Sequence, residues 1–423
     1  IHGHDIHDVF GHHFITGADT VIYVVSLAVF FLVIFTLVGL LVFVESRVSS
    51  EGEKHIVINE DEENTLTVNG TPSLLSALGQ NDIFLPSACG GSGSCGMCKC
   101  VVKEGGGTIL PTELAHLGLA DKKKGKRLSC QLKIKNDMSI ELPRAVFGIK
   151  KFGAEVVSND NVATYIKELV LRPDEPLSFK SGAYIQIDVP EYEFCFKDFH
   201  IDSKYVSEWK KYNLLELTSS GVSPGFRAYS LANPPHEKDI LKMTVKIATP
   251  PPGTSGIPPG FGSSYVFGLR PGDRVTVSGP YGDFFVKESD REKCFIGGGA
   301  GIAPLRSHVL SLLEGGKTKS TISLWYGART RKDMCYHDTF QKLEQMYPNF
   351  FYRVALSRPA PEEGWEGFTG YIQHYLAKDY LEDHDDPAEV EYYLCGPPPM
   401  VDGIVETLDS FGVDMDMIFY DKF

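Results

Sequence analysis

The sequence predicts a multidomain protein with one N-terminal transmembrane helix, a small β-rich domain, an antiparallel β-barrel and a parallel α/β domain. Three observations predict this order. A long apolar run near the N-terminus is followed by a glycine-rich loop with clustered cysteines, and then by strand-like runs whose pattern changes near residue 290. Since a domain averages ~150 residues, a chain of 423 residues has room for about three.

The apolar run Val21 to Val44 contains no charged residue and predicts the transmembrane helix. At ~1.5 Å per residue it reaches ~36 Å, enough to cross a hydrocarbon core ~30 Å thick. A buried core helix and a signal peptide are the alternatives, and both usually have shorter apolar stretches. Arg47 and Lys54 follow the run while no Lys or Arg precedes it, so the positive-inside bias places the later domains in the cytoplasm.

Residues 1–20 are expected to form a short extramembrane tail. Five histidines lie among its first thirteen residues, which leaves a metal site as the less favoured interpretation. Over the whole chain, 41 Lys and Arg against 55 Asp and Glu give a net charge of −14. Such a charge repels phosphate backbones and argues against nucleic-acid binding. The chain has nine cysteines, an odd number, and four of them lie between Cys89 and Cys100, which favours a metal centre in a reducing compartment over a disulfide framework.

The loop ACGGSGSCGMC predicts an iron-sulfur cluster. Cys89, Cys95 and Cys98 lie in this loop and Cys130 follows after 31 residues, which supplies the four thiolates that such a cluster needs. The glycines at 90, 91, 93 and 96 let the backbone approach the cluster without side-chain clashes. Structural zinc usually takes two short cysteine pairs, and only one is present, so a 2Fe-2S cluster is favoured over zinc or a disulfide. Cys100 is interpreted as a non-ligand.

This loop resembles those of ferredoxins, although its first gap of five residues is nearer the adrenodoxin-like spacing than the plant type. The resemblance implies a β-grasp ferredoxin-like domain over residues 53–145. Residues 150–288 follow as short strand-like runs separated by Gly and Pro turns, which predicts an antiparallel β-barrel. From residue 289 to 423 buried strand runs alternate with helical stretches, which predicts a parallel α/β sheet.

The barrel contains RAYSLAN at 227–233, which resembles the R-x-Y-S pattern of the ferredoxin-NADP reductase superfamily. Residues 150–423 as a whole are similar to that superfamily. Tyr229 offers a ring on which a flavin can stack, Ser230 a hydroxyl for the reactive ring nitrogen, and Arg227 a cation for the phosphate. GSSY at 262–265 is expected to open a helix whose free N–H groups hold a pyrophosphate, which favours FAD over FMN.

The stretch CFIGGGAGIAPLRS runs from a predicted strand through a glycine turn into a helix, where a dinucleotide pyrophosphate can lie. Pro304 replaces the third glycine of the usual fingerprint and suits a first helical turn. In the superfamily CGPPPM ends a strand beside the nicotinamide, which implies that Cys395 positions the hydride-bearing carbon. A buried structural cysteine is the alternative. A terminal aromatic shields the flavin in the superfamily, so Phe423 is expected to stack opposite Tyr229, or else to belong to a disordered end.

The predicted site falls into three groups. The predicted catalytic residues are Ser230, Cys395 and Phe423. The predicted cofactor-binding residues are Arg227, Tyr229, Ser230, Lys246, Ala248, Gly262, Ser263, Ser264, Gly297, Gly298, Gly299, Ala300, Gly301, Pro304, Cys395 and Gly396. The predicted metal ligands are Cys89, Cys95, Cys98 and Cys130. NADH and NADPH are not distinguished by these residues, because Arg329, Arg331 and Lys332 are placed where they can meet a 2′-phosphate.

The chain resembles the NADH-oxidising subunits of the sodium-translocating NADH:quinone oxidoreductases in the order of its membrane anchor, cluster domain and reductase domains. It shares with them sequence segments such as SACGGSGSCGMC, GGGTILPTEL and EYYLCGPPPM. The resemblance covers residues 21–423 and leaves out the histidine-rich start. It implies a single-pass subunit of a six-subunit complex in the bacterial inner membrane, facing the cytoplasm, with FAD and a 2Fe-2S cluster as cofactors and NADH as substrate. Since NADH gives two electrons and the cluster takes one, FAD must stand between them, and quinone is reduced elsewhere in the complex.

Two other functions remain open at this point. A membrane-anchored NAD(P)H reductase of an oxygenase or desaturase uses the same chemistry, and a membrane-bound redox sensor belongs to a different class. The family resemblance also includes an inserted stretch from Glu191 to Phe226, which is expected to be either a docking surface or a self-packed loop. Its aromatic residues are Tyr192, Phe194, Phe196, Phe199, Tyr205, Trp209 and Tyr212.

Overall fold

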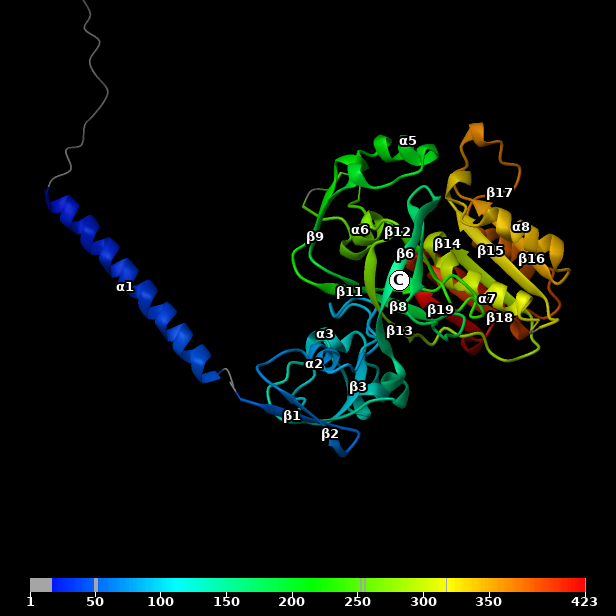
Figure 1. Cartoon of the computed structure of the whole chain (residues 1–423). Coiled ribbons are helices and arrows are strands. Elements are labelled where there is room, and N and C mark those ends of the chain that lie inside the picture. Colours follow the sequence, from blue (N-terminus) through cyan, green and yellow to red (C-terminus); the bar gives the residue numbers. More distant parts are fainter. Residues whose placement is uncertain (1–16, 49–51, 252, 255, 317, 423) are drawn as a thin grey trace, which may run out of the picture.

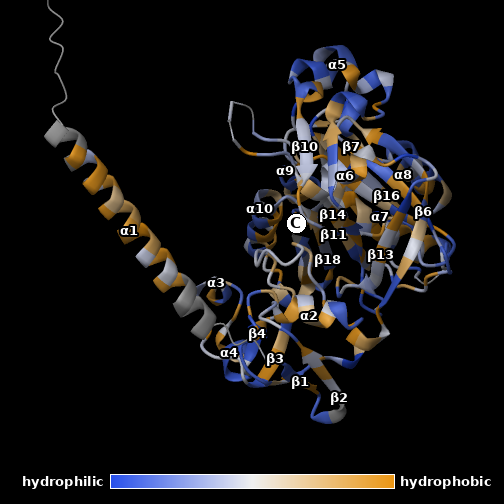
Figure 2. Ribbon diagram, turned by 60° about the vertical axis from the view of Figure 1, so that its left-hand side comes forward, coloured by the Kyte–Doolittle hydropathy of each residue, from blue (hydrophilic) through white to orange (hydrophobic). Residues whose placement is uncertain are grey.

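The computed structural model describes residues 17–48, 52–251, 253–254, 256–316 and 318–422. Helix α1 (Gly17–Val48) stands apart from the rest of the chain, and its middle is apolar all round (Figures 1 and 2). Its segment Tyr23–Leu41 has a mean hydropathy of 2.9 and is not buried by other parts of the protein. The Thr36 hydroxyl donates to the Leu32 carbonyl at 2.7 Å, which satisfies this polar group inside the helix. By length and composition α1 can therefore span a membrane.

Helix α1 is longer than the predicted span 21–44, because its backbone hydrogen bonds continue into the polar residues at both ends, which hydropathy does not count. The predicted histidine cluster of the tail lies outside the described residues.

The first globular part is a five-stranded mixed sheet in the order β2-β1-β5-β3-β4, with β1 and β5 parallel. This is the predicted β-grasp arrangement. Ile56, Leu74, Leu128 and Ile140 are fully buried in its core. Its elements are β1 (Lys54–Ile58), β2 (Asp61–Val68), α2 (Leu74–Gln80), β3 (Lys99–Glu104), α3 (Pro111–Leu114), α4 (Leu119–Lys123), β4 (Lys126–Leu128) and β5 (Met138–Glu141).

A buried ion pair joins α3 to β4. The Glu113 carboxylate is fully buried and accepts hydrogen bonds from the Arg127 guanidinium at 2.6 to 3.1 Å and from the backbone N–H groups of Leu110 and Leu128. Burial raises the pKa of Glu113, but these hydrogen bonds and the Arg127 charge outweigh it and hold the pKa below its usual value. The pair therefore stabilises the fold in its charged form.

Glu113→Gln is expected to destabilise this sheet by about 3–5 kcal/mol at pH 7, because Arg127 is left buried without its charge partner. The pKa of Glu113 is lower in the folded state than in the unfolded state, where it is about 4.3. The charged Glu113 side chain therefore stabilises the fold at pH values above the unfolded-state pKa, and this stabilisation is lost as the pH falls through the folded-state pKa. The gap between wild type and variant should therefore shrink in acid. Urea unfolding followed by the visible absorbance of the cluster measures this difference in the free energy of unfolding. Glu141→Gln is the control, because the Lys103–Glu141 pair is exposed and should contribute little to stability.

The central part is a six-stranded antiparallel sheet in the order β11-β8-β13-β6-β7-β12. An antiparallel bridge between Leu231 and Met243 joins the two outer strands and closes the sheet into the predicted barrel. Its elements are β6 (Lys150–Ala163), β7 (Ile166–Pro173), β8 (Tyr184–Val189), β11 (Gly225–Ser230), β12 (Leu241–Lys246), α6 (Phe261–Gly268) and β13 (Arg274–Tyr281).

The insertion between β8 and β11 packs on itself and on the barrel part. It forms β9 (Tyr192–Cys195), α5 (Ser203–Lys211) and β10 (Thr218–Gly221). Trp209 is fully buried and donates to the Thr164 carbonyl at 2.7 Å, and Phe196 is fully buried beside it. Of the seven aromatic residues only Tyr212 is exposed, so they do not form an exposed aromatic docking surface. The insertion packs partly on itself, as the alternative predicted, and partly on Ile247 and Phe267 of the barrel part.

The last part is a six-stranded parallel sheet in the order β17-β16-β15-β14-β18-β19 with helices on both faces (Figure 1). Two separate core clusters cover those faces, and every residue of β14 and β18 is buried, which explains their continuous apolar runs. Its elements are β14 (Lys293–Gly298), α7 (Ile302–Glu314), β15 (Ile322–Ala328), α8 (His337–Met346), β16 (Phe350–Leu356), β17 (Phe368–Thr369), α9 (Ile372–Leu376), β18 (Glu391–Gly396), α10 (Pro398–Ser410) and β19 (Ile418–Lys422).

Candidate functional site

The four predicted cluster ligands fall into two pairs. The thiols of Cys89 and Cys95 lie 3.4 Å apart, and the thiols of Cys98 and Cys130 are hydrogen-bonded to each other. Among the described residues no three His, Cys, Asp or Glu side chains converge as a single zinc ion would need. Two irons bridged by sulfides need four thiolates, two for each iron, so this arrangement fits a 2Fe-2S cluster. All nine cysteines are free thiols, and Cys100 is buried in the core.

The loop that carries these cysteines depends on its glycines. Gly90, Gly91, Gly93 and Gly96 all have positive φ values between 66° and 89°, a conformation that other residues rarely adopt. A Cβ at Gly90 would overlap the Phe226 carbonyl and the guanidinium of the next residue. The cysteine loop therefore lies directly against β11 of the barrel.

Strand β11 and the start of α6 form the predicted flavin site. The Arg227 guanidinium lies over the ring of Phe261, the first residue of α6, with 5.1 Å from its central carbon to the ring centroid. A Cβ at Gly262 would stand 2.9 Å from the Tyr229 hydroxyl and would overlap the Arg227 side chain. The Arg227 cation, the Tyr229 side chain and the N-terminus of α6 therefore meet in one cradle. A residue larger than glycine at position 262 would not fit there. A flavin with its phosphates fits this set of donors.

The GSSY motif does open a helix, as predicted. The Ser263 hydroxyl accepts from the Ala248 N–H at 3.1 Å and donates to the Gly260 carbonyl at 3.2 Å, so Ala248 shapes the first turn of α6. Ser264 is fully buried in the same turn. Tyr192 of the insertion donates to the Phe261 carbonyl at 2.6 Å and so supports this helix from outside. Sequence reasoning missed this role of the insertion.

The glycine turn after β14 packs against the end of β18. A Cβ at Gly301 would overlap the Cys395 carbonyl and would lie 2.8 Å from the N–H of Gly396, while Gly299 has φ 59°. Pro304 lies in the first turn of α7, as predicted. Cys395 is fully buried at the end of β18, and this position suits both the positioning role and its structural alternative.

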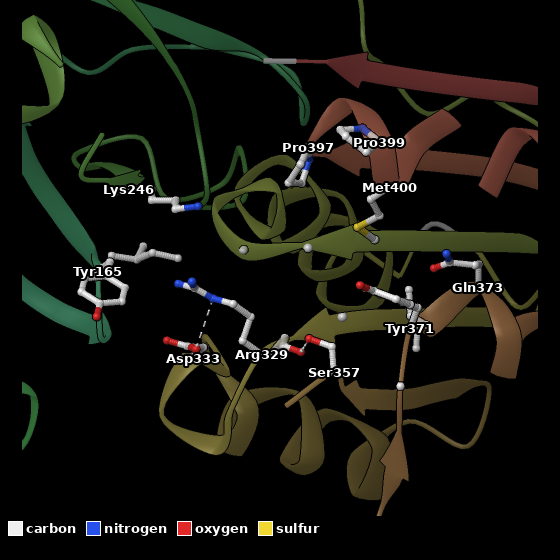
Figure 3. A pocket seen from close by; sticks show the side chains of 17 residues that line it. Tyr165, Lys246, Arg329, Asp333, Ser357, Tyr371, Gln373, Pro397, Pro399 and Met400 are labelled. Carbon is white, nitrogen blue, oxygen red and sulfur yellow. Dashed lines mark hydrogen bonds and ion pairs between the residues drawn. The ribbon is translucent and has the colours of Figure 1, made fainter. Parts of the chain in front are cut away.

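A cavity of about 400 Å³ opens at the carboxyl ends of the parallel strands, where open α/β sheets bind their ligands (Figure 3). Gly298 and Gly299 of the turn line it, and Lys246 reaches it from the barrel side. Although Lys246 and Ala248 are close in sequence, Lys246 lines the cavity, whereas Ala248 contacts the first turn of α6. Other lining residues are Tyr165, Ile166, Gly327, Ala328, Arg329, Asp333, Ser357, Gly370, Tyr371, Ile372, Gln373, Pro397, Pro399 and Met400.

One end of this cavity is charged. Figure 3 shows Arg329 beside Asp333, with Lys246 and Tyr165 facing them from the barrel. The Arg329 guanidinium lies 3.7 Å from the Asp333 carboxylate and over the Tyr165 ring at 5.5 Å. Arg331 is tied instead to Glu363 through its backbone and its guanidinium. Of the three cations suggested for a 2′-phosphate, only Arg329 lines the cavity, and it shares it with a carboxylate.

Ser230 ends β11 beside two tyrosines of the barrel, Tyr184 and Tyr281, whose rings are stacked with centroids 5.2 Å apart. Tyr184 lies opposite Ser230 in the pairing of β8 with β11, and the pKa of Tyr184 is raised by burial and by the neighbouring Tyr281 and Cys95. Phe423 lies outside the described residues, so its shielding role stays a prediction. Tyr165 and Asp333 carried no motif from which they could have been predicted.

Comparison with protein families assigns each part separately. The family described as 2Fe-2S iron-sulfur cluster binding domain matches residues 56–135. The Oxidoreductase FAD-binding domain matches residues 211–286, and the Oxidoreductase NAD-binding domain matches residues 295–406. The chain therefore combines modules for a 2Fe-2S cluster, FAD and NAD.

Curated relatives cover almost the whole chain. The F subunit of the Na(+)-translocating NADH-quinone reductase of Neisseria gonorrhoeae is 46% identical over 95% of this chain and 99% of its own length. The proteins of the same name from Klebsiella pneumoniae and Yersinia pseudotuberculosis are 46% and 44% identical over the same shares. The chain belongs to the family of Na(+)-translocating NADH-quinone reductase F subunits.

Solved structures support the fold of this reductase subunit. The Amycolatopsis cytochrome P450 reductase GcoB aligns with a TM-score of 0.60 at 24% identity, covering 88% of this chain and 98% of that protein. A ferredoxin reductase of carbazole 1,9a-dioxygenase aligns with a TM-score of 0.59 at 25% identity, with the same coverage. The shared fold explains why oxygenase reductases were the nearest alternative from sequence.

Proposed function

We propose that this chain is the electron-input subunit of a membrane-bound, sodium-translocating NADH:quinone oxidoreductase. The observation that carries the proposal is the contact between the cysteine loop and β11, where Gly90 meets Arg227. This contact brings a one-electron centre next to the site of a flavin, in a chain that also has a dinucleotide cavity. The proposal keeps the predicted functional units 53–145, 150–288 and 289–423.

In this proposal the chain's residues bind and orient, and the cofactors supply the redox chemistry. FAD accepts the two electrons of a hydride and releases them singly, and a 2Fe-2S cluster carries single electrons. Arg227 and the α6 N-terminus hold the flavin phosphates, Tyr229 supports its ring and Ser230 faces its reactive nitrogen. The turn at 297–301 holds the dinucleotide pyrophosphate, and Cys395 and Gly396 border the nicotinamide.

Assembly and orientation are also proposals. α1 crosses the inner membrane once, and the positive residues that follow it leave the redox units in the cytoplasm. The relatives are named as one subunit of a reductase, which supports further subunits, and we propose six in all. Quinone is reduced on one of the others. Sodium is not moved by α1, since its segment Tyr23–Leu41 has no charged residue to line an ion path.

Isolation of the full chain from native membranes tests this function. We expect it to purify with five further subunits and to catalyse NADH-dependent quinone reduction that sodium stimulates. Co-isolation with an oxygenase or desaturase component would contradict the proposal and favour the alternative reductase. NADH oxidation that does not turn over with any acceptor would favour a redox sensor.

Asp333→Asn is expected to relax discrimination against NADPH. A 2′-phosphate entering beside Arg329 would also meet the Asp333 carboxylate, and two like charges ~4 Å apart cost ~4 kcal/mol at an effective dielectric constant of ~20. Removing that charge should raise kcat/KM for NADPH about tenfold or more relative to NADH. Steady-state ferricyanide reduction with each cofactor measures the ratio. Asp338→Asn in α8, outside the cavity, is the control and should leave the ratio unchanged.

A further inference from the structure

A segment beside the cluster loop presents three exposed leucines. We call residues 110–124, which include α3 and α4, the leucine segment. Leu110 is 39% exposed, Leu114 48% and Leu119 79%, while Leu117 between them is buried. Leu110 and Leu114 are four residues apart across α3 and so lie on the same side of that turn. Figure 2 shows α3 and α4 at the outer edge of the ferredoxin-like part.

Ion pairs fix the leucine segment to the sheet of the ferredoxin-like part. Glu113 ties it to β4 through the buried pair with Arg127, described above. Asp121 of α4 accepts from Lys99 at 2.9 Å and from Lys126 at 2.8 Å. Such a segment loses little conformational entropy on binding, because its backbone is already ordered. The exposure of its leucines therefore belongs to a fixed surface.

This surface adjoins the cluster. The ring of His116 covers Gly96 in the loop between Cys95 and Cys98, since a Cβ at Gly96 would stand 2.7 Å from the ring nitrogen Nδ1. Lys99, which holds α4, follows Cys98 directly in the chain. A protein resting on the leucine segment would therefore lie close to the iron-sulfur centre.

The barrel occupies a different side of the same part. Gly90 faces Arg227, the Gln186 side chain donates to the Leu85 carbonyl at 3.4 Å, and Lys151 lies over the Phe84 ring at 5.9 Å. Residues 84–90 thus face the flavin unit. In the leucine segment, by contrast, Leu110, Leu114 and Leu119 are exposed to solvent in the described structure.

The charged residues of the leucine segment indicate which kind of partner surface it fits. Lys122, Lys123 and Lys124 end the leucine segment, and the last two are exposed. This positive run stands out on a chain whose net charge is −14. Three exposed leucines followed by a positive run fit a protein surface that has apolar residues at its centre and an acidic rim.

We propose that the leucine segment is the docking surface for the partner subunit that takes electrons from this chain. The inference rests on the proposed function and adds to it the face through which the electron leaves. The transfer moves one electron from the reduced iron-sulfur centre to an oxidised redox centre of the partner, without a bond or a proton. The partner's contact surface is apolar in its middle and carries carboxylates opposite Lys123 and Lys124.

Site-specific crosslinking in native membranes tests which molecule binds the leucine segment. The full chain carries the photoreactive residue p-benzoylphenylalanine in place of Leu119, which is so exposed that the fold should tolerate it. We expect an adduct with another subunit of the complex that itself binds a redox centre, identified by mass spectrometry. The same residue in place of Val222, 86% exposed in the insertion, is the control and should not give that adduct. Adducts to lipid alone, to a second copy of this chain, or none would overturn the proposal.

A functional test uses Leu114→Gln with Leu119→Gln, and separately Lys123→Glu with Lys124→Glu. Both pairs should lower NADH:quinone activity of the assembled complex about fivefold or more, because contacts at an interface centre dominate its affinity. Flavin content, the electron paramagnetic resonance signal of the cluster and NADH:ferricyanide activity should stay at wild-type values. The lysine effect should weaken at high salt. Lys238→Glu, an exposed lysine of the barrel part, is the control and should change nothing.

The two proposals fail in different ways. If the wild-type complex reduces no quinone, the proposed function is wrong. If the wild type reduces quinone and both double variants match it, the function stands and the docking surface is wrong. If a double variant loses its cluster signal, the crosslink at position 119 still decides, since it needs no activity.

Discussion

Alanine in place of any one of Cys89, Cys95, Cys98 or Cys130 is expected to abolish the electron paramagnetic resonance signal of the reduced cluster. Each thiolate belongs to one of the two pairs that the structure brings together, so removing one leaves an iron with a single protein ligand. NADH:quinone activity should fall to background. NADH:ferricyanide activity should persist, because the flavin and dinucleotide sites lie in other parts of the chain.

Cys100→Ala is the matched control for these four variants. Cys100 lies in β3, only two residues from Cys98, but its side chain is 2% exposed in the core. Its cluster signal should equal that of the wild type. Loss of the signal in this variant, or its survival in one of the other four, would contradict the ligand assignment. Retained flavin content and ferricyanide activity show that each variant is folded.

Gly262→Val is expected to weaken flavin binding and to lower NADH oxidation in proportion to the flavin that is lost. The new side chain would collide with Arg227 and approach the Tyr229 hydroxyl, filling the cradle at the N-terminus of α6. Overpacking of this kind costs about 1–3 kcal/mol, and if that cost falls on the flavin-bound state, flavin binding weakens by roughly 5- to 150-fold. Flavin absorbance of the purified full chain, titrated with added FAD, measures the loss.

Gly403→Val is its control. Gly403 lies in α10, where an added Cβ meets only the Gln373 side chain, at 3.6 Å. Flavin content should be unchanged there. If Gly262→Val retains its flavin with wild-type affinity, the cradle formed by β11 and α6 is not the flavin site.

Local patterns were enough to predict the modules and many of their elements. The uncharged run after Val21, the cysteine loop and the glycine turn at 297–301 are contiguous in sequence, so their chemistry and their spacing are readable directly. The positive φ values of the loop glycines agree with the reason given for those glycines. The helix that begins at Phe261 and the first-turn position of Pro304 follow equally from local backbone preferences.

Other features depend on contacts between residues distant in the chain. The insertion is amphipathic and aromatic, a pattern that suits an exposed docking face as well as a packed core, and only the burial of Trp209 and Phe196 decides between them. Arg329 and Asp333 are close in sequence, but Lys246 and Tyr165 reach the same cavity from the barrel part, which no local pattern could predict. A sequence pattern shows which side chains a segment carries, but it does not show which residues from other segments pack against them or pair with their charges.

The sequence by itself determined the order of the modules, the cofactor classes and the cysteines and glycines that serve them, because each depends on residues within one short segment or on a spaced motif. Only the tertiary structure decided that the cysteine loop rests on β11 at Gly90, that Glu113 anchors the leucine segment, and that Lys246 and Tyr165 of the barrel part share the cavity with Arg329. These are packing relations between separate elements. They follow from how apolar faces are buried together, and that burial is a property of the whole chain.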